Sequence, residues 1–173
     1  SGKRGKAGGI KFTASLHEAR KFAAELLGSE IRGFKVDAVL VEEKLKIDKE
    51  YYLAITIDRG AKCPVVLASV QGGMDIEEVP EEHIVKYHVD YSIGMMPFKT
   101  KYITSKLKLP AEEAAQVQEI LVKLYKMFVE LDAELVEINP LVVSDGKIIA
   151  ADAKVIIDDD ALFRQKDLPY VEE

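Results

Sequence analysis

The sequence has little cysteine, few histidines and no long apolar segment. Its one cysteine, Cys63, lies in an apolar stretch, which excludes a disulfide framework and a cysteine-rich metal site. The three histidines are scattered and show neither a metal-binding spacing nor a serine–histidine–aspartate arrangement: His17, His83 and His88. No apolar run approaches the roughly 20 residues of a membrane span. We therefore expect a cytoplasmic protein that makes no membrane contact and has no nucleophile of its own.

The composition is that of a soluble globular protein. Of the 173 residues, 48% are hydrophobic and 31% are charged, and the net charge of −6 argues against a nucleic-acid binder. Charge is distributed unevenly, because the first eleven residues are rich in glycine and basic side chains, whereas the end of the chain is mostly acidic. A sequence that begins inside such a loop, with no preceding strand, is expected to be part of a longer protein.

A β-hairpin is predicted at ELVEINPLVVSDGKIIAADAKV, residues 134–155. Asp145-Gly146 joins two apolar segments, and Asp-Gly is the preferred sequence of a two-residue type I′ turn. This turn would place Asn139 opposite Asp152 and Glu137 opposite Lys154, with opposed Cβ atoms about 5 Å apart on one face. An amide oxygen and a carboxylate with open positions suit Mg²⁺, which completes its shell with water and phosphates.

The same hairpin has a simpler interpretation. Polar residues on hairpin faces are commonly just solvated, so the spacing alone leaves both interpretations open. Pro140 cannot donate a ladder hydrogen bond and is expected at an edge or a bulge. A bulge there would shift the pairing of Asn139 by one residue.

The other elements predict an α+β fold of antiparallel sheet and packed helices. Helices are expected from Ser15 to Gly28, where Ser15 and Glu18 form a capping box, and after Pro110. A short helix is expected at 159–164.

The expected strands are 10–13, 36–43, 50–58 and 64–70, and the last three would form an antiparallel meander. Residues 71–97 should form a loop with short elements. The expected buried stripes are Leu16, Ala19, Ala23, Leu26 and Leu27 in the first helix, and Ala114, Val117, Leu121, Leu124, Phe128 and Leu131 in the second.

Two further features could bind a nucleotide. The opening residues 2–9, GKRGKAGG, combine glycines with three cations, which suits phosphate oxygens, although the loop is not a Walker A motif and a flexible basic leader has similar letters. Glu42 and Glu50 flank a predicted strand-to-strand crossing, where carboxylates can accept hydrogen bonds from a ribose or lie near an adenine amine. Solvated strand ends would explain both glutamates equally well.

Several segments together closely resemble the beta subunits of succinyl-CoA synthetases, the ADP- or GDP-forming succinate–CoA ligases. The matching segments occur in one order across essentially the whole chain: RGKAGGIKF, LVEE with KEYYLAITIDR, VEINPLVV with ADAKV, and DDDALFRQ. The resemblance implies the ATP-grasp fold, with Mg²⁺ and ATP or GTP as cofactors. It also implies an alpha-subunit partner, and succinate and CoA as substrates of the complete enzyme, located in the cytoplasm or, in a eukaryote, in the mitochondrial matrix.

The resemblance assigns roles to individual residues. The magnesium ligands fall on Asn139 and Asp152, and the nucleotide-contacting glutamates on Glu42 and Glu50. Glu137 matches the glutamate beside the phosphohistidine that the alpha subunit supplies. The phosphate loop falls on Lys3, Arg4 and Gly5, although the family usually has glycine where this chain has Lys3.

The resemblance also implies what these residues lack and leaves other functions open. Residues 1–173 would be an incomplete ATP-grasp domain, without the family's upstream strand and its carboxy-terminal CoA-ligase domain, and would be inactive alone. A malate–CoA ligase or another acyl-CoA synthetase beta chain would have similar motifs. A non-catalytic interaction module is the remaining alternative.

Overall fold

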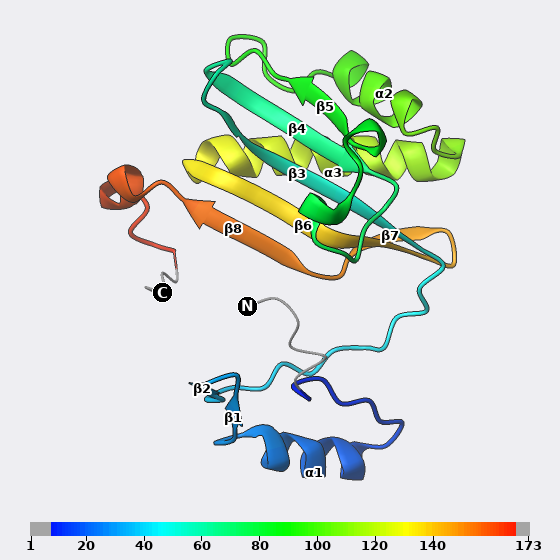
Figure 1. Ribbon diagram of the computed structural model, residues 1–173, viewed down its shortest axis with the longest axis vertical. Coiled ribbons are helices and arrows are strands. Elements are labelled where there is room, and N and C mark those ends of the chain that lie inside the picture. Colours follow the sequence, from blue (N-terminus) through cyan, green and yellow to red (C-terminus); the bar gives the residue numbers. More distant parts are fainter. Residues whose placement is uncertain (1–7, 169–173) are drawn as a thin grey trace. The chain divides into compact units, whose positions relative to one another are not determined.

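The computed structural model describes residues 8–168. Contacts within the chain divide it into two units, Ser1–Leu45 and Lys46–Glu173, which are described separately below. In the described part of the chain, no helix is both long and apolar enough to cross a membrane. Figure 1 shows the elements of both units.

The first unit contains one helix and a short hairpin. Helix α1 spans Leu16–Leu26, and the Ser15 side chain accepts a hydrogen bond from the Glu18 backbone N–H at 3.2 Å, as the capping box predicts. Strands β1 (Glu30–Ile31) and β2 (Phe34–Lys35) pair antiparallel. The position of the first helix is therefore confirmed.

Three expectations for this unit were wrong. Residues 10–13 and 36–43 form no strand, because neither segment finds a ladder partner within residues 8–168. Val41, for example, is 75% exposed. The expected stripe of α1 is also not buried, and Leu16 is 85% exposed. The two-residue strands are too small to cover one face of an eleven-residue helix.

The second unit is a six-stranded antiparallel sheet with two helices. Its order is β5-β4-β3-β6-β7, and β8 also pairs with β6. The strands are β3 (Lys49–Asp58), β4 (Cys63–Ser69), β5 (Val85–His88), β6 (Ala133–Ser144), β7 (Lys147–Ala150) and β8 (Ala153–Ile157). The 3₁₀ helices are η1 (Ile76–Glu78), η2 (Glu81–His83) and η3 (Asp159–Arg164). The α+β class and the antiparallel pairing of β3 with β4 are confirmed, whereas edge strand β5 was not predicted.

The hairpin has the register that its turn predicts. Asp145 and Gly146 both have positive φ, 47° and 78°, as a type I′ turn requires. Ser144 pairs with Lys147 and Glu137 pairs with Lys154. Between these pairs, the Asn139 N–H donates to the Asp152 carbonyl at 3.1 Å. The same register therefore holds along the second arm from Lys147 to Ile156, and it shifts at the last pair, Ala133 with Ile157.

The expected bulge at Pro140 lies on the other side of β6. Between β3 and β6 the register shifts after the Tyr51–Leu141 pair and before the Leu53–Ile138 pair. Asn139 and Pro140 thus stand opposite Tyr52 alone, which is a β-bulge. The shift leaves the pairing of Asn139 with the second hairpin arm unchanged.

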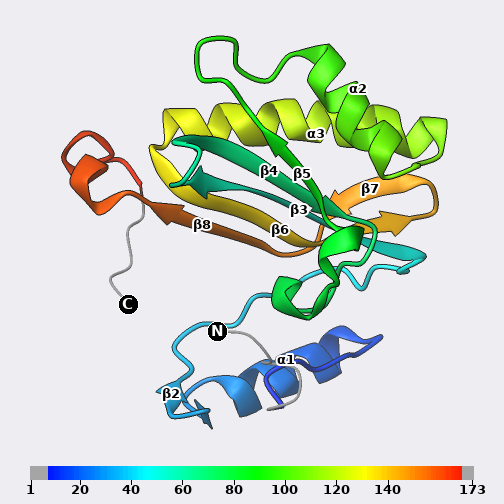
Figure 2. The same cartoon turned by 45° about the horizontal axis from the view of Figure 1, so that its top comes forward.

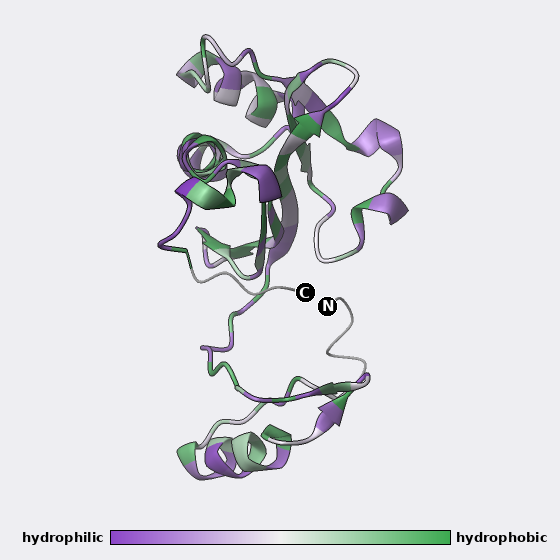
Figure 3. Ribbon diagram, turned by 90° about the vertical axis from the view of Figure 1, so that its left-hand side faces the viewer, coloured by the Kyte–Doolittle hydropathy of each residue, from purple (hydrophilic) through white to green (hydrophobic). Residues whose placement is uncertain are grey.

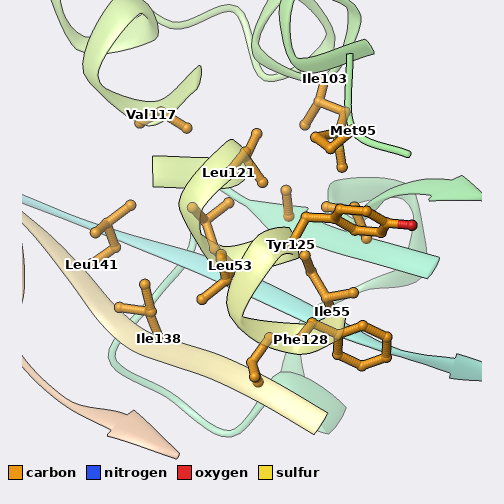
Figure 4. Close-up of a cluster of buried hydrophobic side chains, with 14 of the residues drawn as sticks. Leu53, Ile55, Met95, Ile103, Val117, Leu121, Tyr125, Phe128, Ile138 and Leu141 are labelled. Atoms are coloured by element: carbon orange, nitrogen blue, oxygen red, sulfur yellow. The ribbon is translucent and has the colours of Figure 1, made fainter. Parts of the chain in front are cut away.

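The core lies between the sheet and two helices, α2 (Pro97–Lys106) and α3 (Ala111–Glu130). Both helices cover the same face of the sheet, and α3 runs across it (Figures 1 and 2). Four residues of the expected α3 stripe are buried: Val117, Leu121, Leu124 and Phe128. Figure 4 shows three of them, Val117, Leu121 and Phe128, packed with Leu53 and Ile55 of β3. Helix α3 was predicted and α2 was not.

The opposite face of the sheet carries the segment with η1 and η2. Figure 3 shows these two turns as hydrophilic segments on the side of the sheet away from α3. The helices α2 and α3 thus cover one face of the sheet, and the polar segment with η1 and η2 lies over part of the other face.

Candidate functional site

The candidate residues gather on the face of the sheet opposite α2 and α3, which we call the site face. It is defined by Glu50 and Tyr52 of β3 and Glu137 of β6. Side chains alternate along a strand, and Tyr51, Leu53 and Ile138 belong to the core on the helix side. Their neighbours therefore project from the site face.

Tyr52 and Glu137 are joined across the two central strands. The Tyr52 hydroxyl donates to Glu137 Oε2 at 2.8 Å, and Tyr52 itself is 2% exposed. Burial, the hydrogen bond to Glu137 and the nearby charge of Glu77 all raise the pKa of the Tyr52 phenol above its ordinary value. The phenol therefore stays protonated and acts as a donor to the carboxylate.

The Asn139 side chain holds the loop that follows β4. Its Oδ1 accepts from the Gly73 N–H at 2.8 Å, and its Nδ2 donates to the Met74 carbonyl at 2.8 Å. These two bonds fix which end of the amide is oxygen. Because an amide oxygen has two lone pairs, Oδ1 keeps one acceptor position beyond the bond to Gly73.

Two glycines let this loop approach β3 closely. A Cβ at Gly72 would lie 2.3 Å from the Tyr51 carbonyl oxygen, and one at Gly73 would lie 2.6 Å from Glu50 Oε2. Gly73 also has a positive φ of 74°. The Gly72 N–H donates to the Glu50 carbonyl at 3.0 Å. Only glycine allows residue 72 to lie against the Tyr51 backbone, and Gly73 has the left-handed conformation that favours glycine.

Asp152 lies between β7 and β8, opposite Asn139. The residue is exposed, and its carboxylate has no hydrogen-bond or ion-pair partner within residues 8–168. In the same range, no three histidine, cysteine, aspartate or glutamate residues form a group that could hold a metal ion. Asn139 and Asp152 therefore offer one amide oxygen and one carboxylate, a donor set that fits Mg²⁺ completed by water and phosphate oxygens.

The remaining predicted residues are not part of this cluster. Glu42 is exposed in the first unit, outside any strand. Lys3, Arg4 and Gly5 lie outside the described residues. Glu50, Glu137, Asn139 and Asp152 are thus the predicted residues that the second unit contains.

Sequence reasoning missed Tyr52, Gly72 and Gly73. The Gly-Gly pair was visible but was interpreted only as loop. Tyr52 could have been found from strand alternation. It lies two residues after Glu50, so both side chains project from the same face, and the neighbouring strand carries Glu137.

Comparison with protein families shows a match between residues 1–143 and the model of an ATP-grasp domain family. Among curated proteins, the succinate–CoA ligase [ADP-forming] beta subunit of Methanocaldococcus jannaschii is 52% identical over 130 residues, 73% of this chain and 36% of that protein. The corresponding subunit of Methanothermobacter thermautotrophicus is 44% identical over 176 residues, 100% of this chain and 48% of that protein. The chain thus spans less than half the length of these relatives.

Solved structures show a similar fold. ATP citrate lyase from Methanothrix soehngenii, in complex with citrate and coenzyme A, matches with a TM-score of 0.75 and 27% identity over 97% of this chain and 40% of that one. A dinucleotide-forming acetyl-coenzyme A synthetase from Ca. Korarchaeum cryptofilum, solved with coenzyme A and Mg-AMPPCP, matches with a TM-score of 0.63 and 15% identity over 90% and 70% of the two chains. The second likeness concerns the fold alone.

Proposed function

Since this chain belongs to the ATP-grasp domain family, we propose that it is the nucleotide- and Mg²⁺-binding part of a cytoplasmic succinate–CoA ligase beta subunit. The observation that carries the proposal is that Glu50 and Glu137 lie on the site face of β3 and β6, and that Asn139, at the bulge between these strands, stands opposite Asp152 beside the Gly72-Gly73 loop. Identities of 42–52% to beta subunits support it.

The proposed reaction transfers a phosphoryl group between ATP or GTP and a histidine of the alpha subunit, followed by formation of succinyl-CoA from succinate and CoA in the complete enzyme. Phosphoryl transfer depends mainly on positioning and on neutralising charge. Asn139 and Asp152 would hold Mg²⁺, which when bound neutralises charge on the β- and γ-phosphate oxygens.

The other residues bind and orient. Glu50 would accept a hydrogen bond from the nucleoside, and Glu137 would orient the incoming imidazole. Glu42, together with the phosphate loop at Lys3, Arg4 and Gly5, completes the proposed nucleotide contacts on the basis of the family resemblance. Because the chain spans less than half of its relatives, we propose that residues 1–173 need the rest of the protein for turnover.

The test is Asp152→Asn in the complete heteromeric enzyme. Removing one negative charge from the proposed metal ligands should slow phosphorylation of the alpha-subunit histidine by about 100-fold. The measurement is transfer of label from ATP carrying a radioactive γ-phosphate. Asp160→Asn is the matched control, because Asp160 is also an exposed aspartate but lies in η3. Unchanged labelling in Asp152→Asn would contradict the proposal.

A second candidate keeps the nucleotide chemistry and changes the acid. The 27% identity to an ATP citrate lyase over nearly the whole chain favours this possibility. Coupled assays of the complete enzyme with succinate, malate and citrate distinguish the two candidates. Preferential turnover of citrate or malate would replace succinate as the proposed substrate while keeping the roles of Asn139 and Asp152.

A further inference from the structure

Two adjacent tyrosines of β3 make equivalent hydrogen bonds on opposite faces of the sheet. The Tyr51 hydroxyl donates to Glu113 of α3 on the helix side, and the Tyr52 hydroxyl donates to Glu137 on the site face. Both tyrosines are buried, at 4% and 2% exposure. The pair differs mainly in what lies around the carboxylate that each one holds.

Glu113 belongs to a structural cluster. Its Oε1 also accepts from Lys49 Nζ at 2.7 Å, and the residue is buried at the start of α3. Two donors thus satisfy this carboxylate inside the core, where an unpaired charge would be costly. Tyr51 and Lys49 therefore stabilise the packing of α3 on the sheet.

Glu137 has a different environment. Within residues 8–168, the Tyr52 hydroxyl is the one group that hydrogen bonds to its side chain, through Oε2. Glu137 is only half-buried, and its cross-strand neighbour Lys154 forms no ion pair with it in that range. One carboxylate oxygen is thus held by the protein, and the other has no protein donor.

We propose that Tyr52 is a positioning residue that holds the Glu137 carboxylate in place for phosphoryl transfer. This inference rests on the proposed function, in which Glu137 orients the incoming imidazole. The phenol is fixed by burial on a central strand, so its hydroxyl can restrict the torsions of a more flexible and more exposed side chain. With Oε2 bound to Tyr52, the free Oε1 is the oxygen that accepts from the imidazole N–H.

The geometry explains why a tyrosine is suited to this position. Its hydroxyl donates to the Glu137 carboxylate without placing a positive charge beside it. A lysine or arginine at residue 52 would compete with the imidazole for the Glu137 carboxylate. The aromatic ring also fills space beside the bulge formed by Asn139 and Pro140, so the hydroxyl has a rigid support.

The experiment compares Tyr52→Phe with Tyr51→Phe in the complete enzyme with its alpha subunit. Each change removes one hydroxyl from a buried ring of the same strand. Tyr52→Phe should lower the kcat of histidine phosphorylation by about 10- to 100-fold, because a misplaced catalytic group loses rate in that range. The KM for Mg-ATP should change less than about twofold, since the hydroxyl that is removed hydrogen bonds to Glu137 and not to Asn139 or Asp152.

Tyr51→Phe is the structural control. Loss of its bond to Glu113 should lower the melting temperature while leaving kcat near the wild-type value at temperatures where the enzyme is folded. Melting curves and nucleotide binding heats check that both variants are folded. Equal kcat losses in the two variants would overturn the positioning role and indicate a general effect of lost stability.

A double-mutant cycle with Glu137→Ala separates this inference from the proposed function. If Tyr52 acts through Glu137, adding Tyr52→Phe to Glu137→Ala should cause no further loss of kcat. A full additional loss in that background, or a wild-type kcat in Tyr52→Phe alone, would overturn the inference. If the wild-type enzyme does not phosphorylate its alpha subunit at all, the proposed function itself has failed.

Discussion

Single glycines decide how the loop after β4 meets the site. Gly73 combines a positive φ with a close approach to the Glu50 carboxylate, whereas Gly146 has a positive φ and open space around its Cα. The two positions therefore separate backbone strain from steric contact. An effect that occurs at Gly73 and not at Gly146 comes from the surroundings of Gly73, which are the Glu50 carboxylate and the Asn139 side chain.

We expect Gly73→Ala to weaken nucleotide binding and Gly146→Ala to leave it unchanged. Both variants should lose about 1–2 kcal/mol of stability, because a left-handed conformation is strained for an L-residue. Only the new Cβ at residue 73 displaces Glu50, and loss of one hydrogen bond weakens binding by about tenfold. Calorimetric titration of the complete enzyme with Mg-ATP measures this. Equal affinities in the two variants would argue against Glu50 as a nucleotide contact.

For individual residues, the sequence predicted which residues pair across strands better than it predicted side-chain contacts with loops. Asp145-Gly146 was sufficient to place Glu137 opposite Lys154, because turn geometry fixes the register of the arms that follow it. The bonds from Asn139 to Gly73 and Met74 were not predictable, because they join segments 66 and 65 residues apart. Such contacts depend on tertiary packing and leave no local pattern.

Whole elements were predictable where their buried side is apolar. The α3 helix has hydrophobic residues at every third or fourth position, so its start and most of its stripe follow from the sequence. The buried positions of α2 are mostly polar: Lys99, Thr100, Ile103 and Thr104. The Lys99 ammonium donates to the Gly94 carbonyl at 2.8 Å inside the packing. Without an apolar stripe, periodicity could not indicate this helix.

Strand predictions failed where a partner was needed. Residues 36–43 alternate like a strand, yet β-structure requires a neighbouring strand to satisfy its backbone groups. The residues at 50–58 and 64–70 find such neighbours in each other and in β6 and β5. Alternation alone thus predicts which segments can pair and not which ones do.

Asp132, which follows α3, connects the end of that helix to the 3₁₀ helix η3 through side-chain hydrogen bonds. Arg164 binds Asp132 through two nitrogens, with Nε at 2.7 Å from Oδ2, and the Gln165 side chain donates to the same carboxylate at 2.7 Å. The Arg164 hydrogen bond, and then that of Gln165, lower the pKa of Asp132 to about 2. The hydrogen bonds that hold η3 beside the end of α3 therefore depend on an ionised Asp132.

We expect the interaction between Asp132 and Arg164 to weaken in acid. Because the folded-state pKa lies below the ordinary value of about 4, the stabilisation is complete above pH 4 and is lost as the pH falls toward 2. Arg164→Lys cannot form the two-nitrogen contact and should melt at a lower temperature than wild type at neutral pH. The difference between the two melting temperatures should shrink between pH 4 and pH 2. A constant difference across that range would contradict the role of Asp132.

Over the whole described chain, burial is concentrated in one unit. No residue from 8 to 45 is buried, whereas the second unit contains the entire described core. Local stability follows the density of buried contacts, since segments with few of them open without global unfolding. The two units are therefore expected to differ in stability although they belong to one chain.

Hydrogen exchange of the 173-residue chain should show this difference directly. Backbone amides of α1 should exchange rapidly, because its cap hydrogen bond from Glu18 to Ser15 stabilises only the first turn and no packed face protects the rest. Amides of β3 and β6 should exchange most slowly, because both strands are paired on two sides and lie against α3. Mass spectrometry of peptides from the two units measures both classes in one sample. Slow exchange throughout α1 would mean that its exposed apolar residues are covered in solution, and the division into a stable and a weakly stable unit would then be wrong.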